Sequence, residues 1–421
     1  MQTIVFSPAA YNLAETTRTI EIAKACRDTF NILFVSYGGE FESLVEEEGF
    51  QTRHLMPRLT RAKIDYLYRV DQGRAFGYYF SDAEVQEQVR NEISLFEQMK
   101  PVAVVTGFNF SNSISCRVAG VPLVWVTQST WMMQAMFDAG LGTWPDMLDF
   151  PPLRWLPERL LIRLSRQALA FSGFFARPYD RVARQYGLEP FGSMERLWEG
   201  DYNLLAEPKG FCEIELPPTY HYIGPLIGHL DVPIPEDITN MPKDRPVVYF
   251  AMGSSGQPEV IAKIIEGFRG KPYRVIAPVK NQIEHLDVDV PENVLVTGWL
   301  PSHKVNPMAD ISIIHGGIGT VMTACLSGTP IIGVAMMIEQ EANIDCLVRK
   351  GFAIRIRKNR FTPGKLCEAI DQLLADGEAR RRAKAFQKVV QEWDDPSRMA
   401  DFFVNTFAQG APLLGKRPQG V

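Results

Sequence analysis

The sequence predicts an α/β protein with two domains, each built on a parallel sheet that has helices on both faces. Short apolar runs alternate with helix-compatible segments through most of the chain, a pattern typical of parallel sheets. The length of 421 residues suits two hydrophobic cores better than one. A proline-rich stretch, 222–246, separates the two alternating halves. We therefore expect domains at 1–225 and 246–395, a linker at 226–245 and a C-terminal segment at 396–421.

The first half alternates regularly up to about residue 126. Apolar, β-rich runs predict strands at 3–7, 31–36, 102–106 and 121–126. Helices are expected at 13–28, 40–48 and 82–99. The last of these begins at a capping box, because Ser81 precedes Glu84 by three residues.

Residues 127–184 lose this alternation and are rich in Trp, Met, Phe and Pro. The helix-compatible stretch 157–175 has Arg159, Arg163 and Arg166 along one side. Three interpretations stay open: the lining of an apolar pocket, a basic amphipathic helix on a membrane surface, or an ordinary packed helix with solvated arginines. Either functional interpretation favours a large, hydrophobic or lipid-like ligand.

The second half shows a new series of alternating elements. Strands are expected at 247–251, 293–297, 311–314 and 331–334, and helices at 258–268 and 321–326. Beyond Thr362 and Pro363 the chain is helix-compatible to near residue 408, and the tail 409–421 is expected to be disordered.

A glycine-rich turn after the 311–314 strand predicts a phosphate site. It reads His-Gly-Gly-Ile-Gly-Thr over 315–320 and leads into a helix. Glycines at such a junction let backbone N–H groups approach an anion, and the helix N-terminus adds partial positive charge. His315 and Thr320 can each add a donor to the same anion.

Polar and aromatic residues flank this turn. Trp299 precedes it, in the sequence Trp-Leu-Pro, and Glu339 and Gln340 follow the next strand, with Asn343 three residues on. An indole can stack on a base, and an open α/β sheet binds ligands beyond the ends of its strands. In order and spacing, these segments resemble the C-terminal half of the UDP-glycosyltransferase-like family, inverting sugar transferases of GT-B fold, whose signature runs WxP, HGGxGT, GxP and DQxxN.

The resemblance implies which residues bind the sugar-nucleotide donor. In the family the tryptophan stacks on the base, the histidine and glycine turn hold the diphosphate, and the acidic–Gln pair grips sugar hydroxyls. A Gly-Ser turn after the first strand of the second domain also approaches the diphosphate. The implied donor-binding residues here are Ser254, Ser255, Trp299, Leu300, His315, Gly316, Gly317, Gly319, Thr320, Glu339 and Gln340. The resemblance further implies that the last helix, from about 396, crosses back to the first domain.

The first half departs from the family at the catalytic base. Family members carry a base histidine after the first strand, in a G-H-x-T-R motif, and an aspartate after the fourth, in V-V-x-D. Here Thr17 and Arg18 match T-R, but Glu15 stands at the histidine position, and Gly107 stands where the aspartate should be. A partly desolvated carboxylate can act as a base, so Glu15 is the candidate. The alternatives are Asn12, by a one-turn slip, and a Glu15 that simply belongs to the first helical turn.

Two departures concern the donor and one expectation concerns the acceptor. Thr323 replaces the glutamate that binds ribose hydroxyls, and Ser302 replaces a glutamine after WxP. A thymidine donor lacks the 2′-hydroxyl and would depend less on that glutamate. Both UDP-sugars and dTDP-sugars therefore remain candidate donors. We expect Trp131 and Phe137 to line an apolar acceptor site.

Composition excludes several classes of function. A net charge of -5 argues against a general nucleic-acid binder. The six cysteines are scattered without metal-ligand spacing, which predicts reduced thiols and no zinc site. The N-terminus lacks a basic signal-peptide region, and no apolar run approaches the ~20 residues of a membrane span. We expect a cytoplasmic protein, at most peripheral at the inner membrane face.

Together these observations predict an inverting, metal-independent hexosyltransferase of GT-B fold. It would move a sugar from a nucleoside-diphosphate sugar to a hydroxyl of a hydrophobic or lipid-like acceptor, without a cofactor. The missing His–Asp dyad motivates a second hypothesis, a catalytically silent sugar-nucleotide-binding partner protein. A nucleotide-sugar epimerase of the same fold is a third. The sequence does not specify the oligomeric state.

Overall fold

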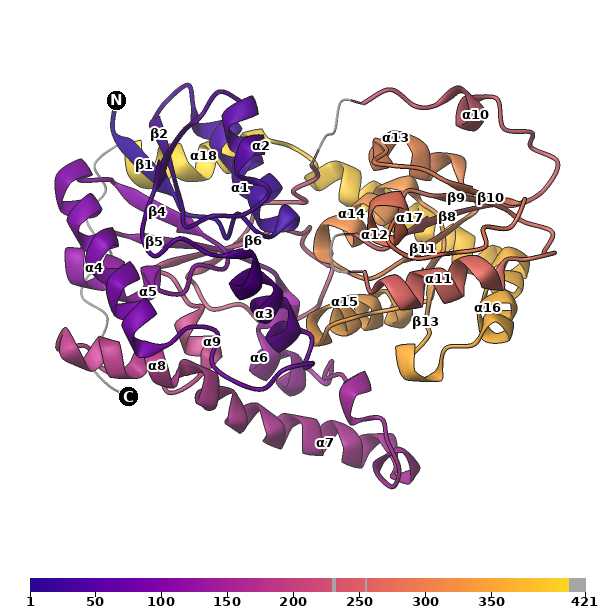
Figure 1. Cartoon of the computed structure of the whole chain (residues 1–421), viewed down its shortest axis with the longest axis horizontal. Helices are drawn as coiled ribbons and strands as arrows, with labels where there is room; N and C mark the ends of the chain where they lie inside the picture. Colours follow the sequence, from indigo (N-terminus) through magenta and orange to yellow (C-terminus); the bar gives the residue numbers. More distant parts are fainter. Residues whose placement is uncertain (229–231, 254–255, 409–421) are drawn as a thin grey trace.

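The computed structural model describes residues 1–228, 232–253 and 256–408, and contains two parallel sheets side by side (Figure 1). The first has seven strands in the order β3-β2-β1-β4-β5-β6-β7, and the second has six in the order β10-β9-β8-β11-β12-β13. Every strand pair in both sheets is parallel. The predicted α/β architecture with two doubly wound sheets is confirmed.

The first-sheet strands are β1 (Thr3–Phe6), β2 (Asn31–Ser36), β3 (Gln51–His54), β4 (Ala103–Thr106), β5 (Leu123–Thr127), β6 (Tyr202–Leu205) and β7 (Tyr220–Tyr222). Helices in this half are α1 (Leu13–Cys26), α2 (Glu42–Glu47), α3 (Arg61–Asp71), α4 (Asp82–Met99), α5 (Asn112–Ala119), α6 (Met133–Asp138), α7 (Glu158–Ala168), α8 (Gly173–Gln185) and α9 (Met194–Leu197). Short 3₁₀ turns are η1 (Ser129–Trp131), η2 (Asp146–Leu148), η3 (Leu153–Trp155) and η4 (Leu169–Ser172).

The second-sheet strands are β8 (Val247–Ala251), β9 (Arg274–Ala277), β10 (Val294–Val296), β11 (Ile311–Ile314), β12 (Ile331–Gly333) and β13 (Ala353–Arg355). The helices are α10 (Glu236–Thr239), α11 (Pro258–Gly267), α12 (Lys280–Ile283), α13 (Ser302–Val305), α14 (Ile318–Ser327), α15 (Ile338–Arg349), α16 (Pro363–Ala375), α17 (Gly377–Trp393) and α18 (Ser397–Phe403). The remaining turns are η5 (Asn306–Met308), η6 (Lys358–Arg360) and the π-helical η7 (Val404–Ala408).

Each sheet has a topological switch point, where the chain winds outward in both directions from two central strands. In the first sheet these strands are β1 and β4, and in the second they are β8 and β11. Open α/β sheets bind ligands beyond the carboxyl ends of such a pair. The predicted base follows β1, and the predicted phosphate turn follows β11, so both candidate sites lie at switch points.

The last helices pack against the first sheet. In Figure 1, α18 lies beside β1 and α1 although it comes near the end of the described chain. Met399, Phe403 and Phe407 are buried in the same hydrophobic cluster as Ile4 and Phe6. This apolar contact ties the end of the chain back to its beginning. The tail 409–421, expected to be disordered, lies outside the described residues.

One sequence prediction needs correction, and some elements were not predicted. The stretch 157–175 is not one helix, because α7 ends at Ala168 and α8 begins at Gly173 after the η4 turn. Within the predicted linker, the unpredicted helix α10 buries Ile238 against Val247 and Tyr249. A short apolar contact of this kind gives no periodic signal in the sequence. The strands β3, β6 and β7 and the helix α3 were not predicted either.

Polar contacts join the two halves along one edge. Asp146, in the first half, is buried and accepts from Arg357 Nη1 at 2.8 Å and from the Lys358 N–H at 2.9 Å. Asp149 forms an ion pair with Arg360. Because these carboxylates are removed from water, their partners on the second half must stay in place to satisfy them.

Candidate active site

Glu15 lies in the first turn of α1, just beyond the end of β1. The Asn12 side chain caps this helix, its Oδ1 accepting from the N–H groups of Ala14 at 3.0 Å and Glu15 at 3.3 Å. The Glu15 side chain is 4% exposed and forms an ion pair with Arg18 one turn further on. Burial raises the pKa of the Glu15 carboxyl, and Arg18 opposes that rise. Asn12 thus acts as a helix cap, and Glu15 presents a desolvated, oriented carboxylate.

The carboxylate of Glu15 lies directly against Gly107, which follows β4. A Cβ built on Gly107 would come 2.1 Å from Glu15 Oε2 and 2.7 Å from Cδ, so no other residue type fits there without moving Glu15. Gly107 is the position where the sequence comparison expects an aspartate. The space beside β4 is filled by a carboxylate that comes from α1 instead.

In the second half, His315 lies at the end of β11, enclosed by two glycines. A Cβ on Gly253, which follows β8, would come 2.5 Å from the imidazole Cε1, and a Cβ on Gly317 would come 2.6 Å from Nε2. Burial lowers the pKa of His315 to about 4, and the Ala251 backbone opposes this shift. Nδ1 makes no hydrogen bond of ordinary geometry to any described residue. The ring is therefore neutral at physiological pH.

The phosphate turn is tighter than the sequence predicted, because α14 begins at Ile318 and not at residue 321. Thr320 therefore belongs to the first helical turn. Gly317 is the N-cap, and Gly316 has a positive φ of 95° and packs against the Gln340 carbonyl. A Cβ on Gly319 would meet nothing within 4 Å, so the N-terminus of α14 is open there. Ser254 and Ser255, the other predicted diphosphate ligands, lie outside the described residues.

Trp299 and Leu300 have opposite environments. The Trp299 indole is 45% exposed and available to a planar ligand. Leu300 is buried in an apolar cluster with Tyr249, so its side chain cannot contact a donor. Ser302 is hydrogen-bonded to the Tyr249 hydroxyl at 2.8 Å. Among these residues, Trp299 offers the available side-chain surface.

The acidic–Gln pair lies at the start of α15, and its two members differ. Gln340 is buried, and its Oε1 accepts from the Met336 N–H at 2.9 Å, which holds the turn before the helix. Asn343 donates to the Gly316 carbonyl at 2.9 Å and accepts from Thr130 of the first half at 2.7 Å. The Gln340 amide thus holds the turn before α15, and the Asn343 amide holds the phosphate turn. Glu339 differs, because its Oε2 is buried without a partner among the described residues.

Charged groups from both halves meet around Glu339. Burial raises the pKa of Glu339 well above its ordinary value, Asp71 raises it further, and Arg18 lowers it. Asp71 ends α3 and accepts from the Tyr79 hydroxyl at 3.3 Å, and burial raises its pKa to about 6. Arg18 therefore lies in the field of two predicted functional carboxylates, Glu15 and Glu339, one from each half. Sequence analysis missed Asp71 and Tyr79, because nothing in the pattern indicated α3.

Trp131 belongs to an aromatic cluster that extends to the surface of the first half. Its ring lies 5.7 Å from that of Phe108, which contacts Tyr79 at 6.3 Å. The series continues from Tyr79 to Phe175 at 5.7 Å, then through Phe174 to Phe76, which is 81% exposed. Phe137, the other predicted acceptor residue, packs its ring over Gly142. The structure thus places Trp131 in an apolar series that includes Tyr79, the partner of Asp71.

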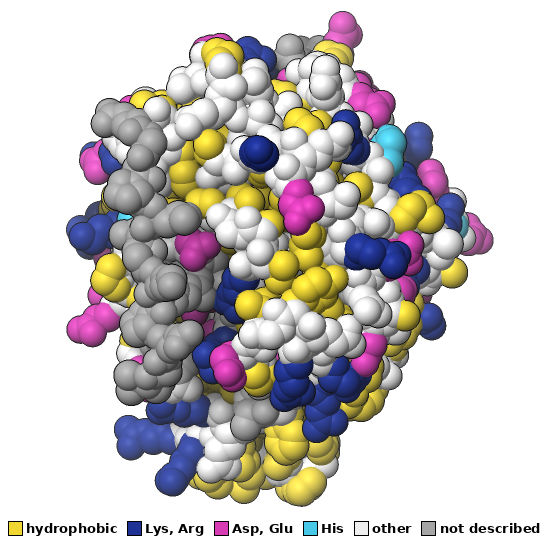
Figure 2. Space-filling model, turned by 90° about the vertical axis from the view of Figure 1, so that its left-hand side faces the viewer, with side chains coloured by type: hydrophobic (Ala, Val, Ile, Leu, Met, Phe, Trp, Pro, Cys, Tyr) yellow, Lys and Arg dark blue, Asp and Glu magenta, His cyan; other side chains and the backbone are white. Residues whose placement is uncertain are grey.

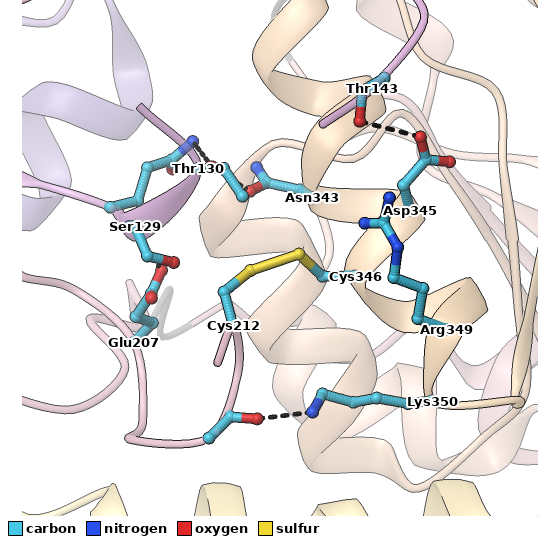
Figure 3. Close-up of a disulfide and its surroundings, with 12 residues drawn as sticks. Ser129, Thr130, Thr143, Glu207, Cys212, Asn343, Asp345, Cys346, Arg349 and Lys350 are labelled. Atoms are coloured by element: carbon cyan, nitrogen blue, oxygen red, sulfur yellow. Dashed lines mark hydrogen bonds between the residues drawn. A yellow bond between two sulfur atoms is a disulfide. The ribbon is translucent and has the colours of Figure 1, made fainter. Parts of the chain in front are cut away.

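The prediction of reduced cysteines is wrong for two of the six, because Cys212 and Cys346 form a disulfide (Figure 3). Cys212 follows β6, and Cys346 is on α15, 134 residues away. In Figure 3, the Thr130–Asn343 and Thr143–Asp345 hydrogen bonds flank the bridge. Scattered cysteines give no pairing signal in a sequence, since only the packing of the two halves brings these two together. The other four cysteines are buried and free.

Other features bear on ligands. Within residues 1–228, 232–253 and 256–408, no group of three or more His, Cys, Asp or Glu side chains is arranged to hold a metal ion. No helix in the same part of the chain combines the length and apolarity needed to cross a bilayer. One hollow of about 560 Å³ is lined by Phe171, Phe174 and three arginines of α8, away from both switch points. Another, of about 580 Å³, is lined by residues 245, 269–274 and 291–293. Neither is the candidate active site.

Comparisons with known proteins agree with the fold. Residues 273–400 match the family described as Erythromycin biosynthesis protein CIII-like, C-terminal domain. A PGL/p-HBAD biosynthesis glycosyltransferase of Mycobacterium tuberculosis is 28% identical over 395 residues, covering 91% of this chain and 89% of that protein. An inactive PGL/p-HBAD biosynthesis glycosyltransferase of Mycobacterium bovis is 27% identical, covering 63% of this chain and 70% of its own. The solved spinosyn rhamnosyltransferase complexed with thymidine diphosphate is 15% identical and covers 97% of this chain and 100% of its own, with a TM-score of 0.68.

The two parallel α/β sheets, together with the similarity to named glycosyltransferases, identify the chain as a glycosyltransferase of GT-B fold. These similarities in sequence and fold support the resemblance to the UDP-glycosyltransferase-like family.

Proposed function

We propose that the protein is an inverting glycosyltransferase that moves a sugar from a nucleoside-diphosphate sugar to a hydroxyl of an apolar acceptor. The observation that carries this proposal is that Arg18, the ion-pair partner of Glu15, also lowers the pKa of Glu339 in the other half. Two of these residues follow β1, and the third begins α15 of the other half, so the charges converge from both sheets. A transfer reaction needs groups that act on the acceptor on one side and groups that hold the donor on the other.

Glu15 is the proposed general base. As the acceptor oxygen attacks the anomeric carbon, its proton passes to the Glu15 carboxylate and the bond between that carbon and the diphosphate oxygen breaks. The electron pair leaves with the diphosphate. Burial makes Glu15 more basic than an ordinary glutamate, and Arg18 and Gly107 hold the carboxylate in one orientation.

The diphosphate would leave toward the N-terminus of α14. The open N-terminus at Gly319 and the helix dipole favour an anion there. The His315 imidazole, held neutral, donates one hydrogen bond and so stabilises the developing charge without a metal ion. Trp299 is the proposed base platform, and Glu339, with its free Oε2, the proposed ligand of sugar hydroxyls. The donor nucleoside is uridine or thymidine.

The aromatic series around Trp131 supports a hydrophobic acceptor. It leads from exposed Phe76 to Tyr79, which bonds Asp71 near Glu339. Replacing Trp131 with Ala should raise the acceptor's KM more than the donor's. A matched Phe191→Ala change, in a buried ring of the same half, controls for loss of packing. Equal effects of Trp131→Ala on both substrates would contradict an acceptor role.

A second candidate, a silent sugar-nucleotide-binding partner, is favoured by the ion pair that engages Glu15 with Arg18. One experiment separates the two. Calorimetry with UDP- and dTDP-sugars measures donor binding, and turnover is measured with long-chain phenols and alcohols in excess EDTA. Turnover in EDTA supports the transferase. Donor binding without turnover on any acceptor supports the silent partner, and activity that requires Mg²⁺ or Mn²⁺ contradicts the metal-independent mechanism.

A further inference from the structure

Exposed hydrophobic side chains gather on one part of the first half, around α7. Single exposed apolar residues are ordinary, but a contiguous group marks an interaction site. Trp155, in the η3 turn before α7, is 75% exposed, and Phe171, in the η4 turn after it, is 76% exposed. The other exposed large hydrophobic residues of this region are Phe76, Met147, Phe150, Leu160 and Leu164.

The helix α7 has three distinct sides. Leu161 and Ser165 are buried and face the protein. Leu160 and Leu164, spaced by four residues, are exposed on a second side. Arg159 and Arg163 precede each of these leucines by one position and so form a third, basic side next to the leucines. This arrangement is that of an interfacial helix, with an apolar stripe bordered by cations.

The charge of this surface is positive and largely uncompensated. No ion pair within the described residues involves Arg159, Arg163, Arg177 or Arg184. The acidic groups nearby are mostly engaged: Asp138 pairs with Arg166, Asp82 with Arg181, and Asp180 accepts two backbone N–H groups. Glu158 is the exception on α7. The chain as a whole is acidic, so this basic region is a local feature.

A basic hollow continues the surface beyond α7. The cavity of about 560 Å³ on α8 is lined by Phe171 together with Arg177, Arg181 and Arg184, and by one carboxylate, Asp180. Its size suits a phosphate-bearing headgroup, and Phe171 joins it to the apolar side of α7.

The surface lies at one end of the molecule. In Figure 1, α7 runs along the lower edge, beyond both sheets. Figure 2, turned about the vertical axis, shows hydrophobic side chains gathered at the same lower end, with Lys and Arg side chains above them. The segment leading to α7 also carries Asp146 and Asp149, which contact the second half. These contacts place the segment that leads to the surface beside the junction of the two halves.

We propose that α7 and its flanking turns dock on an anionic lipid bilayer. The leucines, Trp155 and Phe171 enter the headgroup–acyl boundary, and the unpaired arginines contact lipid phosphates. Charge complementarity favours an anionic bilayer at this surface. The four arginines around the apolar stripe have no acidic partners among the described residues, and in contact with a neutral protein surface they would repel one another. Aromatic and leucine side chains beside the cations supply the apolar part of the binding. This docking does not depend on the proposed reaction.

The test is co-sedimentation of the full chain with vesicles of phosphatidylcholine, alone or mixed with phosphatidylglycerol. The wild type should bind the mixed vesicles and bind pure phosphatidylcholine far more weakly, and added salt should reduce binding. Each arginine near such a surface is worth about fivefold in partitioning, the equivalent of ~1 kcal/mol. Arg159→Gln with Arg163→Gln should therefore reduce binding about 25-fold, by the same per-residue value.

The matched control is Lys263→Gln with Lys388→Gln. These two exposed lysines of α11 and α17 lie on the second half, and the double change alters the net charge equally. It should leave binding unchanged. Leu160→Ser with Leu164→Ser should also weaken binding, and because both side chains are exposed this variant should fold normally.

Three results would overturn the proposal. The first is equal binding of the wild type to both kinds of vesicle. The second is an equal loss in the arginine and lysine variants, which would mean attraction by overall charge. The third is a wild type that does not bind vesicles but forms a dimer in sedimentation equilibrium, where the leucine variant is a monomer. That result would mean that a second copy of the chain covers this surface.

Discussion

Both switch points carry candidate functional residues, but only the one in the second sheet keeps the residues of the family signature. Beyond β8 and β11, the histidine and the glycine turn occur in the order and spacing of the family signature, and two glycines enclose the imidazole. Beyond β1 and β4, the family's His–Asp dyad is absent, and a carboxylate from α1 occupies the space over Gly107. Diphosphate binding depends on backbone geometry, which leaves few alternatives. A general base needs only a basic atom in the right place, so it can be supplied from another element.

The largest expected effect concerns Glu15. Glu15→Gln keeps the shape and removes the basic lone pair, so kcat should fall by ~100- to 10,000-fold with donor affinity near wild type. Because the pKa of Glu15 is raised, wild-type kcat should fall as the pH drops through that raised pKa and protonates the base. The variant should lose this acidic limb. If the variant kept more than about a third of wild-type kcat, the loss would be far smaller than the range for a general base. Glu15 would then be only a residue of the first helical turn.

The second effect concerns His315. His315→Ala removes one donor to the leaving diphosphate, which should cost ~3 kcal/mol in turnover and weaken donor binding. Burial lowers the pKa of this histidine to about 4, so its contribution should not change between pH 6 and 8. Calorimetry with the sugar nucleotide and a pH profile of kcat check both points. Unchanged donor affinity would contradict the assignment of the second switch point.

The third effect tests whether Gly107 positions Glu15. Gly107→Ala introduces a Cβ at the site of the carboxylate and should displace it, with a loss of about 100-fold in kcat, as expected for a misplacement near 1 Å. Gly377→Ala, at an exposed site without a positive φ where a Cβ meets nothing, controls for general effects of a glycine-to-alanine change. In a Glu15→Gln background, Gly107→Ala should cost little more. Additive losses would show that Gly107 acts independently of Glu15.

The smallest effect concerns the bond between the halves. The Cys212–Cys346 disulfide fixes α15, which carries Glu339, to the first half, and such bonds are worth about 2–4 kcal/mol. Reduction, or Cys212→Ser with Cys346→Ser, should lower the midpoint of thermal unfolding. Reductant should have no further effect on the double variant. If reductant lowered the midpoint of the wild type and the double variant equally, the stabilisation would come from elsewhere.

By itself, the sequence determined the strand–helix order and the second switch point. The strands Ile311–Ile314 and Val247–Ala251 were predicted with the bounds that the structure has, because apolar runs flanked by glycine are local signals. The tertiary structure decided the placement of Glu15 over Gly107, the field of Asp71 on Glu339, and the pairing of Cys212 with Cys346. It also showed that Leu300 is buried and that Gln340 holds a turn. The first three of these relations join residues that are far apart in the chain, and they depend on tertiary packing, which no local pattern encodes.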